Sequence, residues 1–257
     1  MCIRDRNLYD LVLFCLQNKK HMGYQAKLKW LKRRFDEGLR IKLIKAPEGK
    51  AIGFIEYTPG EFTWRIINAP NHLVIHCLWV HTKELSNKGL ASKLITAVIT
   101  EAKQEKYSGV AVVTSDGSWM VRKEIFLKNG FEIVDKVEPH FQLLVNKINK
   151  KVVPSFPNDW EERLERITGL QLLYTDQCPY IGKAINELPK VVKKYGIKLR
   201  LVEMKNAEEA RKIMPSPYGM FNLVNNGILL SDHPISATRF KNILERDLNL
   251  KSKSWNM

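Results

Sequence analysis

A glycine after a polar loop marks a segment whose residue types favour phosphate binding. The apolar run His76–Val80 leads into the polar loop His81–Lys88, and Gly89 stands just before a helix expected over Leu90–Lys103. The first turn of a helix has unpaired N–H groups and the positive end of the helix dipole, so it attracts an anion. Glycine allows close approach because it has no Cβ. The alternative is a plain strand-to-helix turn that contains one glycine. The supporting small and basic residues are Ala91, Ser92, Lys83, Lys88 and Lys93.

Three side chains are candidates for a general base. Glu56 lies between Ile55 and Tyr57 on an expected strand, where burial among apolar neighbours would raise its pKa. The alternative for Glu56 is a surface carboxylate on an edge strand. Glu61 stands beside an expected turn, which makes it the weaker candidate. His76 lies in the middle of a strand, and its alternative is a core histidine. Strand alternation places His76 on the face of Val74, Leu78 and Val80, with Cys77 on the other face.

Cys178 is a candidate nucleophile in the second half of the chain. It precedes Pro179 at an expected helix start, where the dipole stabilises a thiolate and proline is readily accommodated. Ile181 occupies the position of a resolving cysteine, so dithiol exchange within this motif is excluded. Monothiol chemistry and a module used only for packing both stay open. The four cysteines form no CxxC pair, so we expect no metal site and a reducing, cytoplasmic location.

Hydrophobic periodicity predicts a mixed sheet with few helices in the first part of the chain. The turn at Pro59-Gly60 separates two of the strands. Helices are expected over Leu8–Leu16, Tyr24–Phe35, Leu90–Lys103 and Met120–Lys128, the last ended by Asn129-Gly130. Strands are expected over Ile41–Ile44, Ala51–Tyr57, Phe62–Ile67, Leu73–Val80, Val110–Thr114, Phe131–Val137 and Phe141–Val145.

A second small α/β unit is expected after a polar stretch that contains Pro154 and Pro157. We place the domains at 7–148 and 167–250, with a linker over 149–166. The expected order of elements in the second unit is βαβαββα, with a hairpin turn at Asn225-Asn226-Gly227. Its strands are expected over Leu170–Tyr174, Ile197–Met204, Phe221–Val224 and Ile228–Leu230. Its helices are expected from Cys178 to about Tyr195 and over Ala207–Met214 and Ile235–Leu248.

The order of elements over residues 7–146, together with two motifs, resembles the GNAT family of N-acetyltransferases. Ser86-Asn87-Lys88-Gly89-Leu90-Ala91 is similar to the family's pyrophosphate motif Q/R-x-x-G-x-G/A, with Ser86 in place of Gln or Arg. Phe126-Leu127-Lys128-Asn129-Gly130-Phe131 resembles the family's Y-x-x-x-G-F element, with Phe126 in place of the tyrosine. The implied fold is α/β (α+β), with a mixed-sheet acetyltransferase domain first.

The resemblance implies acetyl-CoA as the co-substrate and direct attack by an amine on its thioester. Backbone groups of Leu78, Trp79 and Val80 would bind the pantetheine arm. The N–H groups of Asn87, Lys88, Gly89, Leu90, Ala91 and Ser92 would bind the pyrophosphate. Glu56 and His76 are the catalytic candidates in this domain. The tyrosine that usually protonates the leaving thiolate is missing at Phe126. An unassisted thiolate can still leave, because a thiol pKa is about 8.5.

The second unit resembles the thioredoxin-like fold, and the whole chain is similar to the YoaP-like acetyltransferases. The Cys178-Pro179-Tyr180 stretch lies where thioredoxin-like proteins carry their active cysteine. Cys178 is therefore our third catalytic candidate. This fold places a cis-proline beside that cysteine, and the candidates are Pro215 and Pro217, with Pro217 favoured.

Composition bounds the possible partners. The chain has 257 residues, 44% of them hydrophobic and 27% charged, with a net charge of +15, and it has no apolar run long enough for a membrane span. Residues 1–150 carry 25 basic and 15 acidic residues, against 17 and 12 in residues 151–257. A phosphorylated co-substrate accounts for part of this excess. We expect an amine on a small molecule or peptide as the acceptor, and neither a membrane nor a nucleic acid as a partner. Nucleic-acid binding by the basic run Lys27–Arg34 and a non-catalytic CoA- or partner-binding protein are the alternatives.

Overall fold

The structure is a computed structural model that describes residues 2–3, 15–16, 18–81, 89–117, 119–149 and 152–251. Its chain forms two compact units. The N-terminal unit comprises residues 1–17 and 28–157, and the C-terminal unit comprises residues 18–27 and 158–257. Most of the helix expected over Leu8–Leu16 and the polar loop 82–88 lie outside the described residues.

A seven-stranded sheet with the order β1-β2-β3-β4-β5-β7-β6 forms the centre of the N-terminal unit. Its β4 and β5 pair in parallel, and the other neighbouring strands pair antiparallel. The expected mixed sheet is therefore confirmed. The strands are β1 (Cys2–Ile3), β2 (Arg40–Lys45), β3 (Ala51–Pro59), β4 (His72–Val80), β5 (Gly109–Ser115), β6 (Glu132–Val137) and β7 (Phe141–Lys147).

The parallel pair of strands separates partway along its length. β4 pairs with β5 only from His72 to Ile75, although β4 continues to Val80 and β5 to Ser115. A register shift accompanies the separation, because Glu56 of β3 pairs with Cys77 while the next residue, Tyr57, pairs with Ile75. This β-bulge changes the direction of β4. The carboxyl ends of β4 and β5 therefore diverge at one edge of the sheet.

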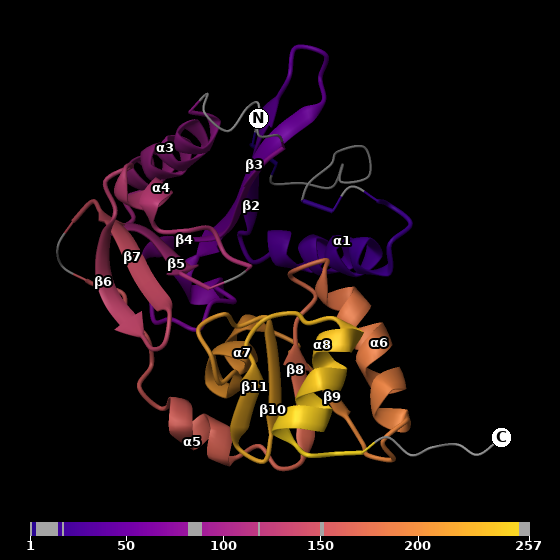
Figure 1. Ribbon diagram of the computed structural model, residues 1–257. Helices are drawn as coiled ribbons and strands as arrows, with labels where there is room; N and C mark the ends of the chain where they lie inside the picture. The colour runs from indigo at the N-terminus through magenta and orange to yellow at the C-terminus, as the bar shows by residue number, and fades with distance from the viewer. Residues whose placement is uncertain are drawn as a thin grey trace. The chain divides into compact units, whose positions relative to one another are not determined.

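Helices α3 (Leu90–Gln104) and α4 (Glu124–Leu127) lie on the same side of this sheet (Figure 1). Leu94, Ile95 and Val98 of α3 are buried in a core that also contains Ile55, Ile75 and Leu78. Branched side chains from the strands suit such a helix-on-sheet layer. Helix α1 (Met22–Phe35) matches the helix expected over Tyr24–Phe35, and its first residues, up to Lys27, belong to the C-terminal unit.

The C-terminal unit contains a four-stranded sheet with the order β11-β10-β8-β9. Strands β8 and β9 are parallel, and β10 is antiparallel to β8 and β11. Asn226 and Gly227 both have positive φ, which confirms the hairpin turn expected between β10 and β11. The elements are α5 (Trp160–Glu165), β8 (Leu170–Tyr174), α6 (Ile181–Lys193), β9 (Arg200–Glu203), α7 (Ala207–Ile213), β10 (Phe221–Asn225), β11 (Ile228–Ser231), α8 (Ala237–Asn242) and the π-helical turn η2 (Ile243–Asp247).

Two element predictions for the N-terminal unit are corrected. The strand expected over Phe62–Ile67 was wrong, because a 3-10 turn, η1 (Gly60–Phe62), is followed by irregular chain. The backbone N–H groups of Trp64 and Arg65 bond to the side chains of His76 and Thr63, so they form no strand ladder. The helix expected over Met120–Lys128 shrinks to the four residues of α4.

Candidate functional site

Backbone groups of Leu78 and Val80 point into the space between β4 and β5. The N–H group of His81 donates to Ile52 O on β3 at 2.7 Å. Alternate residues of a strand point their polar groups in opposite directions, so those of Trp79 also face β3. Leu78 and Val80 then face the side where β5 has already separated from β4. Such a row of strand groups suits an extended amide chain.

The N-terminus of α3 is open towards an anion. Gly89 precedes the helix with a φ of +68°, and no side chain caps the first turn. The first helical bond joins Lys93 N to Gly89 O at 2.9 Å, so the N–H groups of Leu90, Ala91 and Ser92 point outward. A Cβ on Gly89 would meet no atom within 4 Å, so the left-handed φ is what requires glycine here. Asn87 and Lys88 lie outside the described residues.

A hydrogen bond that the sequence did not predict joins the first turn of α3 to the segment Phe126–Phe131. The Asn129 side chain donates to Ser92 Oγ at 3.0 Å and to Ile125 O at 2.7 Å. The Ser92 hydroxyl accepts this bond and so keeps its own hydrogen for another acceptor. Asn129 thus fixes the first turn of α3 against the end of α4.

Glu56 and His76 meet beneath the bulge. The His76 Nδ1 atom lies 3.6 Å from Glu56 Oε1, and the two side chains are 0% and 1% exposed. The structure therefore brings together two of the predicted catalytic residues. Glu61 does not join them, because it accepts a hydrogen bond from Asn71 N at 2.8 Å, near the opposite end of β4.

The hydrogen bonds of His76 define its tautomer. Trp64 N donates to His76 Nε2 at 3.2 Å, and Thr63 Oγ1 lies 3.1 Å from the same nitrogen. An Nε2 atom that accepts cannot carry the proton of a neutral imidazole, so this proton sits on Nδ1 and faces Glu56. The His76 Nε2 atom is therefore occupied and cannot take a proton from outside, while Nδ1 faces Glu56 at 3.6 Å.

The bulge also corrects the predicted face of His76. Leu78 belongs to the core under α3 together with Ile55 and Tyr57. Glu56 lies between those two residues, so its side chain points to the opposite face, and His76 is there with it. Because the extra residue interrupts the alternation, His76 does not share a face with Leu78. The His76 carbonyl accepts from Arg65 Nη2 at 2.6 Å, where β5 no longer pairs with β4.

Phe126 has no role in proton transfer. It is 1% exposed and belongs to the core, with its ring 5.4 Å from the Phe131 ring in an edge-to-face arrangement. A phenyl ring has no proton to donate to a thiolate. Because phenylalanine replaces tyrosine at position 126, this position offers no acid, and the side chain serves only in packing.

The other end of α3 carries a buried charge cluster. Glu101 accepts hydrogen bonds from Tyr57 Oη at 2.9 Å and from Arg40 Nη1 at 2.5 Å, and it forms an ion pair with Lys42. Arg40 also binds both carboxylate oxygens of Glu105. Burial by itself raises the pKa of Glu101, but the bonds from Lys42, Tyr57 and Arg40 bring it below its ordinary value. This cluster is a structural one, because every group in it is paired.

Cys178 lies in the turn between β8 and α6 and is half-buried. Helix α6 starts at Ile181, three residues after Cys178, so the thiol lies before the first helical turn. Close packing surrounds this turn within the C-terminal unit. A Cβ on Gly23 would come within 1.8 Å of Pro179 O, and one on Gly182 would come within 2.8 Å of the Gly23 Cα. The Cys178 turn and residues 22–23 thus meet backbone to backbone.

The cis-proline predicted near Cys178 was wrong. Among the described residues only the Glu138–Pro139 peptide is cis, so both Pro215 and Pro217 follow trans peptides. The nearby loop is held in another way, because Arg163 Nη1 donates to Met214 O at 2.9 Å.

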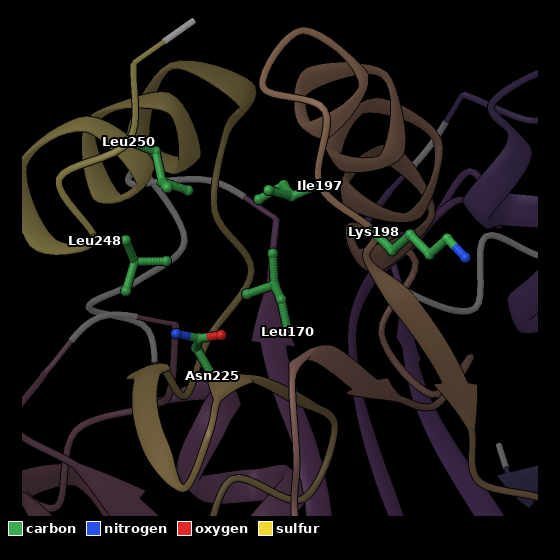
Figure 2. Close-up of a pocket in the computed structure, with 6 residues that line it drawn as sticks. All are labelled: Leu170, Ile197, Lys198, Asn225, Leu248 and Leu250. Atoms are coloured by element: carbon green, nitrogen blue, oxygen red, sulfur yellow. The ribbon is translucent and has the colours of Figure 1, made fainter.

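A cavity of about 330 Å³ lies at the opposite end of β8 from Cys178. Figure 2 shows its apolar side chains gathered around the space, while Lys198 extends away from them. Nothing in its lining resembles a catalytic group. The lining residues are Leu170, Ile197, Lys198, Asn225, Leu248 and Leu250.

The described residues offer neither a metal site nor a membrane span. They contain no group of three or more His, Cys, Asp or Glu side chains able to hold a metal ion. Nor does the part of the chain that the structure describes include a helix with the length and apolar character of a membrane span.

Comparison with known proteins identifies the N-terminal part. Residues 6–121 match the family model described as acetyltransferase (GNAT) family. The uncharacterised N-acetyltransferase YoaP of Bacillus subtilis (strain 168) is 29% identical over 247 residues, which cover 94% of this chain and 96% of YoaP.

Solved acetyltransferase structures align with about half of the chain. A GNAT-family acetyltransferase from Staphylococcus aureus Mu50 is 16% identical and covers 58% of this chain and 99% of its own, with a TM-score of 0.40. The Escherichia coli GNAT protein YhbS in complex with CoA is 13% identical and covers 54% and 79%, with a TM-score of 0.36.

Proposed function

Residues 6–121 form a GNAT acetyltransferase domain, which makes the chain an acetyl-CoA-dependent N-acetyltransferase, and we propose that Glu56 is its general base. The acceptor we propose is an amine on a small molecule or peptide. The observation that carries the proposal is the buried Glu56–His76 pair beside the point where β4 leaves β5. The proposed domain bounds are 7–148 and 167–250. The chain divides after Pro157, within the proposed linker, but residues 18–27 belong to the second unit.

The residues at the edge of the sheet fit acetyl-CoA. Its thioester carbonyl is open to direct attack by an amine. Leu78 and Val80 would bind the pantetheine amides through the strand groups that β5 leaves unpaired, whereas the backbone groups of Trp79 face β3 and would not contribute. The open N–H groups of Leu90, Ala91 and Ser92, with Gly89 before them, would bind the pyrophosphate. Asn87 and Lys88 would extend this cradle.

Glu56 would take the proton of the attacking ammonium group. The carboxylate is 1% exposed, so we propose that the proton reaches it through water rather than by direct contact. His76 acts as a positioning residue, because its Nδ1–H faces Glu56 and its Nε2 is held by Trp64 and Thr63. The thiolate of CoA would leave without help from Phe126.

For the C-terminal unit we propose a thioredoxin-like module that takes no part in acetyl transfer. Its βαβαββα order and parallel β8–β9 pair support this fold. Cys178 would serve as a monothiol or as a packing residue of the turn after β8. The cytoplasmic location and the lack of a nucleic-acid partner stay predictions.

The replacement Glu56→Gln tests the proposed base. We expect kcat to fall about a hundredfold at neutral pH, while the Kd of acetyl-CoA changes less than twofold. The remaining activity should rise with pH towards the amine pKa, because the free amine then no longer needs a base. Steady-state kinetics across pH, with any amine that the wild type acetylates, measure this.

Glu61→Gln is the matched control, since it removes a carboxylate at the other end of β4. It should keep wild-type kcat and pH dependence. A Glu56→Gln variant within threefold of wild-type kcat would show that Glu56 is not the base.

A further inference from the structure

The strands β4 and β5 part from each other although each keeps its other neighbour. β5 stays paired with β7 as far as Ser115, and β4 stays paired with β3 as far as Val80. Between β4 and β5 the last pair is Ile75 with Val112. Neighbouring strands gain by extending their ladder, because a backbone group without a partner costs free energy. The partners of the first backbone groups beyond this pair therefore decide whether the two strands stay apart.

Arg65 binds the first carbonyl of β4 beyond the last pair with β5. Its Nη2 atom donates to His76 O at 2.6 Å. In the ladders that the structure describes, His76 is paired with neither β3 nor β5, because the register of β3 skips it and the pairing with β5 ends one residue earlier. The guanidinium thus takes the place of a strand as the partner of this carbonyl.

The segment that supplies Arg65 is buried and fixed at both ends. Arg65 is 4% exposed. Its backbone N–H donates to Thr63 Oγ1 at 3.1 Å, and Ile67 N donates to Arg65 O at 2.9 Å. Asn68 and Ser155 then form a bridge, with backbone bonds of 2.8 and 3.0 Å. A guanidinium on a segment held in this way has little freedom to leave its acceptor.

The chemistry of arginine suits this position. The guanidinium stays charged when it is buried, and it carries five N–H donors in a fixed plane. A charged donor binds a carbonyl more strongly than the neutral N–H of a neighbouring strand does. The bond from Arg65 to His76 O is therefore favoured over a continued β4–β5 ladder at this point.

We propose that Arg65 is a positioning residue that holds β4 away from β5 and so keeps the backbone groups of Leu78 and Val80 available to the pantetheine arm of acetyl-CoA. The proposal rests on the proposed function, because it takes the pantetheine arm to lie between these two strands. If Arg65 served the stability of the fold alone, its loss would lower the free energy of unfolding and leave the recognition of the pantetheine arm unchanged.

Two ligands separate the positioning role from a purely structural one. CoA carries the pantetheine arm, and adenosine 3′-phosphate 5′-diphosphate is the same molecule without that arm. For Arg65→Met we expect the Kd of CoA to rise about tenfold, because β4 then pairs further with β5 and the arm loses its bonds to the strand. The Kd of the shorter ligand should stay within about twofold of wild type, since the N-terminus of α3 still binds its phosphates. Calorimetric titration of the full chain measures both constants.

Amide hydrogen exchange reports on the two strands directly. In the wild type the amides of Leu78 and Val80 should exchange rapidly in the free chain and slowly once CoA is bound. In Arg65→Met these two amides should be protected before CoA is added, because β5 then accepts their hydrogen bonds. A change in stability alone would not protect them.

Arg163→Met is the matched control. Arg163 is 7% exposed, and its Nη1 atom donates to Met214 O at 2.9 Å in the C-terminal unit. This variant also removes a buried guanidinium from a backbone carbonyl. It should lower the free energy of unfolding and leave the Kd of both ligands at the wild-type value.

Two further replacements of Arg65 complete the series. Arg65→Lys should keep the Kd of CoA within about threefold of wild type, because an ammonium group can still donate to the carbonyl. Arg65→Gln has an amide that stops short of His76 O. It takes the place of Arg65→Met if that variant does not fold, and the same Kd values are expected for it.

The outcomes separate this proposal from the proposed base. An unchanged Kd of CoA in Arg65→Met or Arg65→Gln, an equal rise in the Kd of both ligands, or the same selective rise in Arg163→Met would overturn the role of Arg65. Amides of Leu78 and Val80 that did not respond to CoA in the wild type would overturn it together with the placement of the pantetheine arm. A Glu56→Gln variant with wild-type kcat would overturn the base alone and leave the Kd values of the Arg65 variants as they are.

Discussion

The two ends of α3 differ in a way that separates function from stability. At the N-terminus the first turn has no acidic residue and no side-chain cap, and Lys93 adds positive charge. At the C-terminus Glu101 and Glu105 are bound by Arg40, and Lys42 also pairs with Glu101. Helix dipoles favour the reverse distribution, with acids first and bases last.

The difference shows at which end of α3 the protein's own side chains compensate the charges. Strand β2 supplies the cations that compensate the two glutamates, so that end needs no ligand. The N-terminal end keeps its positive potential, and we attribute this to the phosphates of the co-substrate. Changes at the C-terminal end should therefore alter folding, and changes at the N-terminal end should alter binding.

The replacement Glu101→Gln should give the largest effect. It leaves Arg40 and Lys42 without their buried partner, so we expect a loss of about 2 kcal/mol in the free energy of unfolding. Acetyl-CoA affinity should stay within twofold. Urea unfolding and calorimetric titration measure the two quantities.

The pH dependence of this loss follows from the pKa of Glu101, which lies below its ordinary value of 4.5 in the folded state. Stabilisation by the ionised carboxylate is complete above the unfolded-state pKa and is lost as the pH falls through the folded-state pKa. The difference in the free energy of unfolding between wild type and Glu101→Gln should therefore start to narrow as the pH falls below the unfolded-state pKa of about 4.3. If this difference in the free energy of unfolding stayed constant down to pH 3, ionised Glu101 would not be the group that stabilises the fold.

Replacing Gly89 should weaken binding at the other end. Gly89→Val places a β-branched residue at a φ of +68°, so we expect about a tenfold rise in the Kd of acetyl-CoA. Gly89→Asn is the matched control, because asparagine tolerates the left-handed region and the space around the Cβ is open. If both variants bound acetyl-CoA like the wild type, the loop would not form the pyrophosphate site.

The smallest effect is expected from Cys178→Ser. Because Cys178 lies in the turn after β8, outside the sheet that carries α3, kcat and KM for acetyl transfer should stay within about twofold of wild type. A collapse of transfer would mean that the thiol belongs to the acetyltransferase site.

Periodicity and turn residues predicted most of the fold because they are local signals. The strand over Ala51–Tyr57, the helix over Leu90–Lys103 and the hairpin at Asn226-Gly227 are confirmed. The expected strand Phe62–Ile67 failed because Thr63 and His76 side chains take the N–H groups that a strand would use. The bond from Trp64 N to His76 joins residues 12 positions apart, so it leaves no local pattern.

The candidate site was predicted in its residue types but not in its geometry. Residue type and expected strand position selected Glu56 and His76, yet only the bulge in β4 places them on one face. The bond from Asn129 to Ser92 joins residues 37 positions apart, so it had no signal in the sequence. The sequence predicted the anion-binding chemistry of Gly89–Ser92, but it did not predict the contacts that hold this segment in place.

A change of charge at position 92 tests most directly whether the N-terminus of α3 binds the phosphates of acetyl-CoA. Ser92→Asp and Ser92→Asn have the same shape, and both can accept the bond from Asn129. The aspartate should stabilise the helix by about 0.5 kcal/mol relative to the asparagine, since it meets the positive end of the dipole. It should also raise the Kd of acetyl-CoA about tenfold at low salt, and less at high salt. Equal affinity for acetyl-CoA in the two variants would contradict the claim that this helix end holds the co-substrate's phosphates.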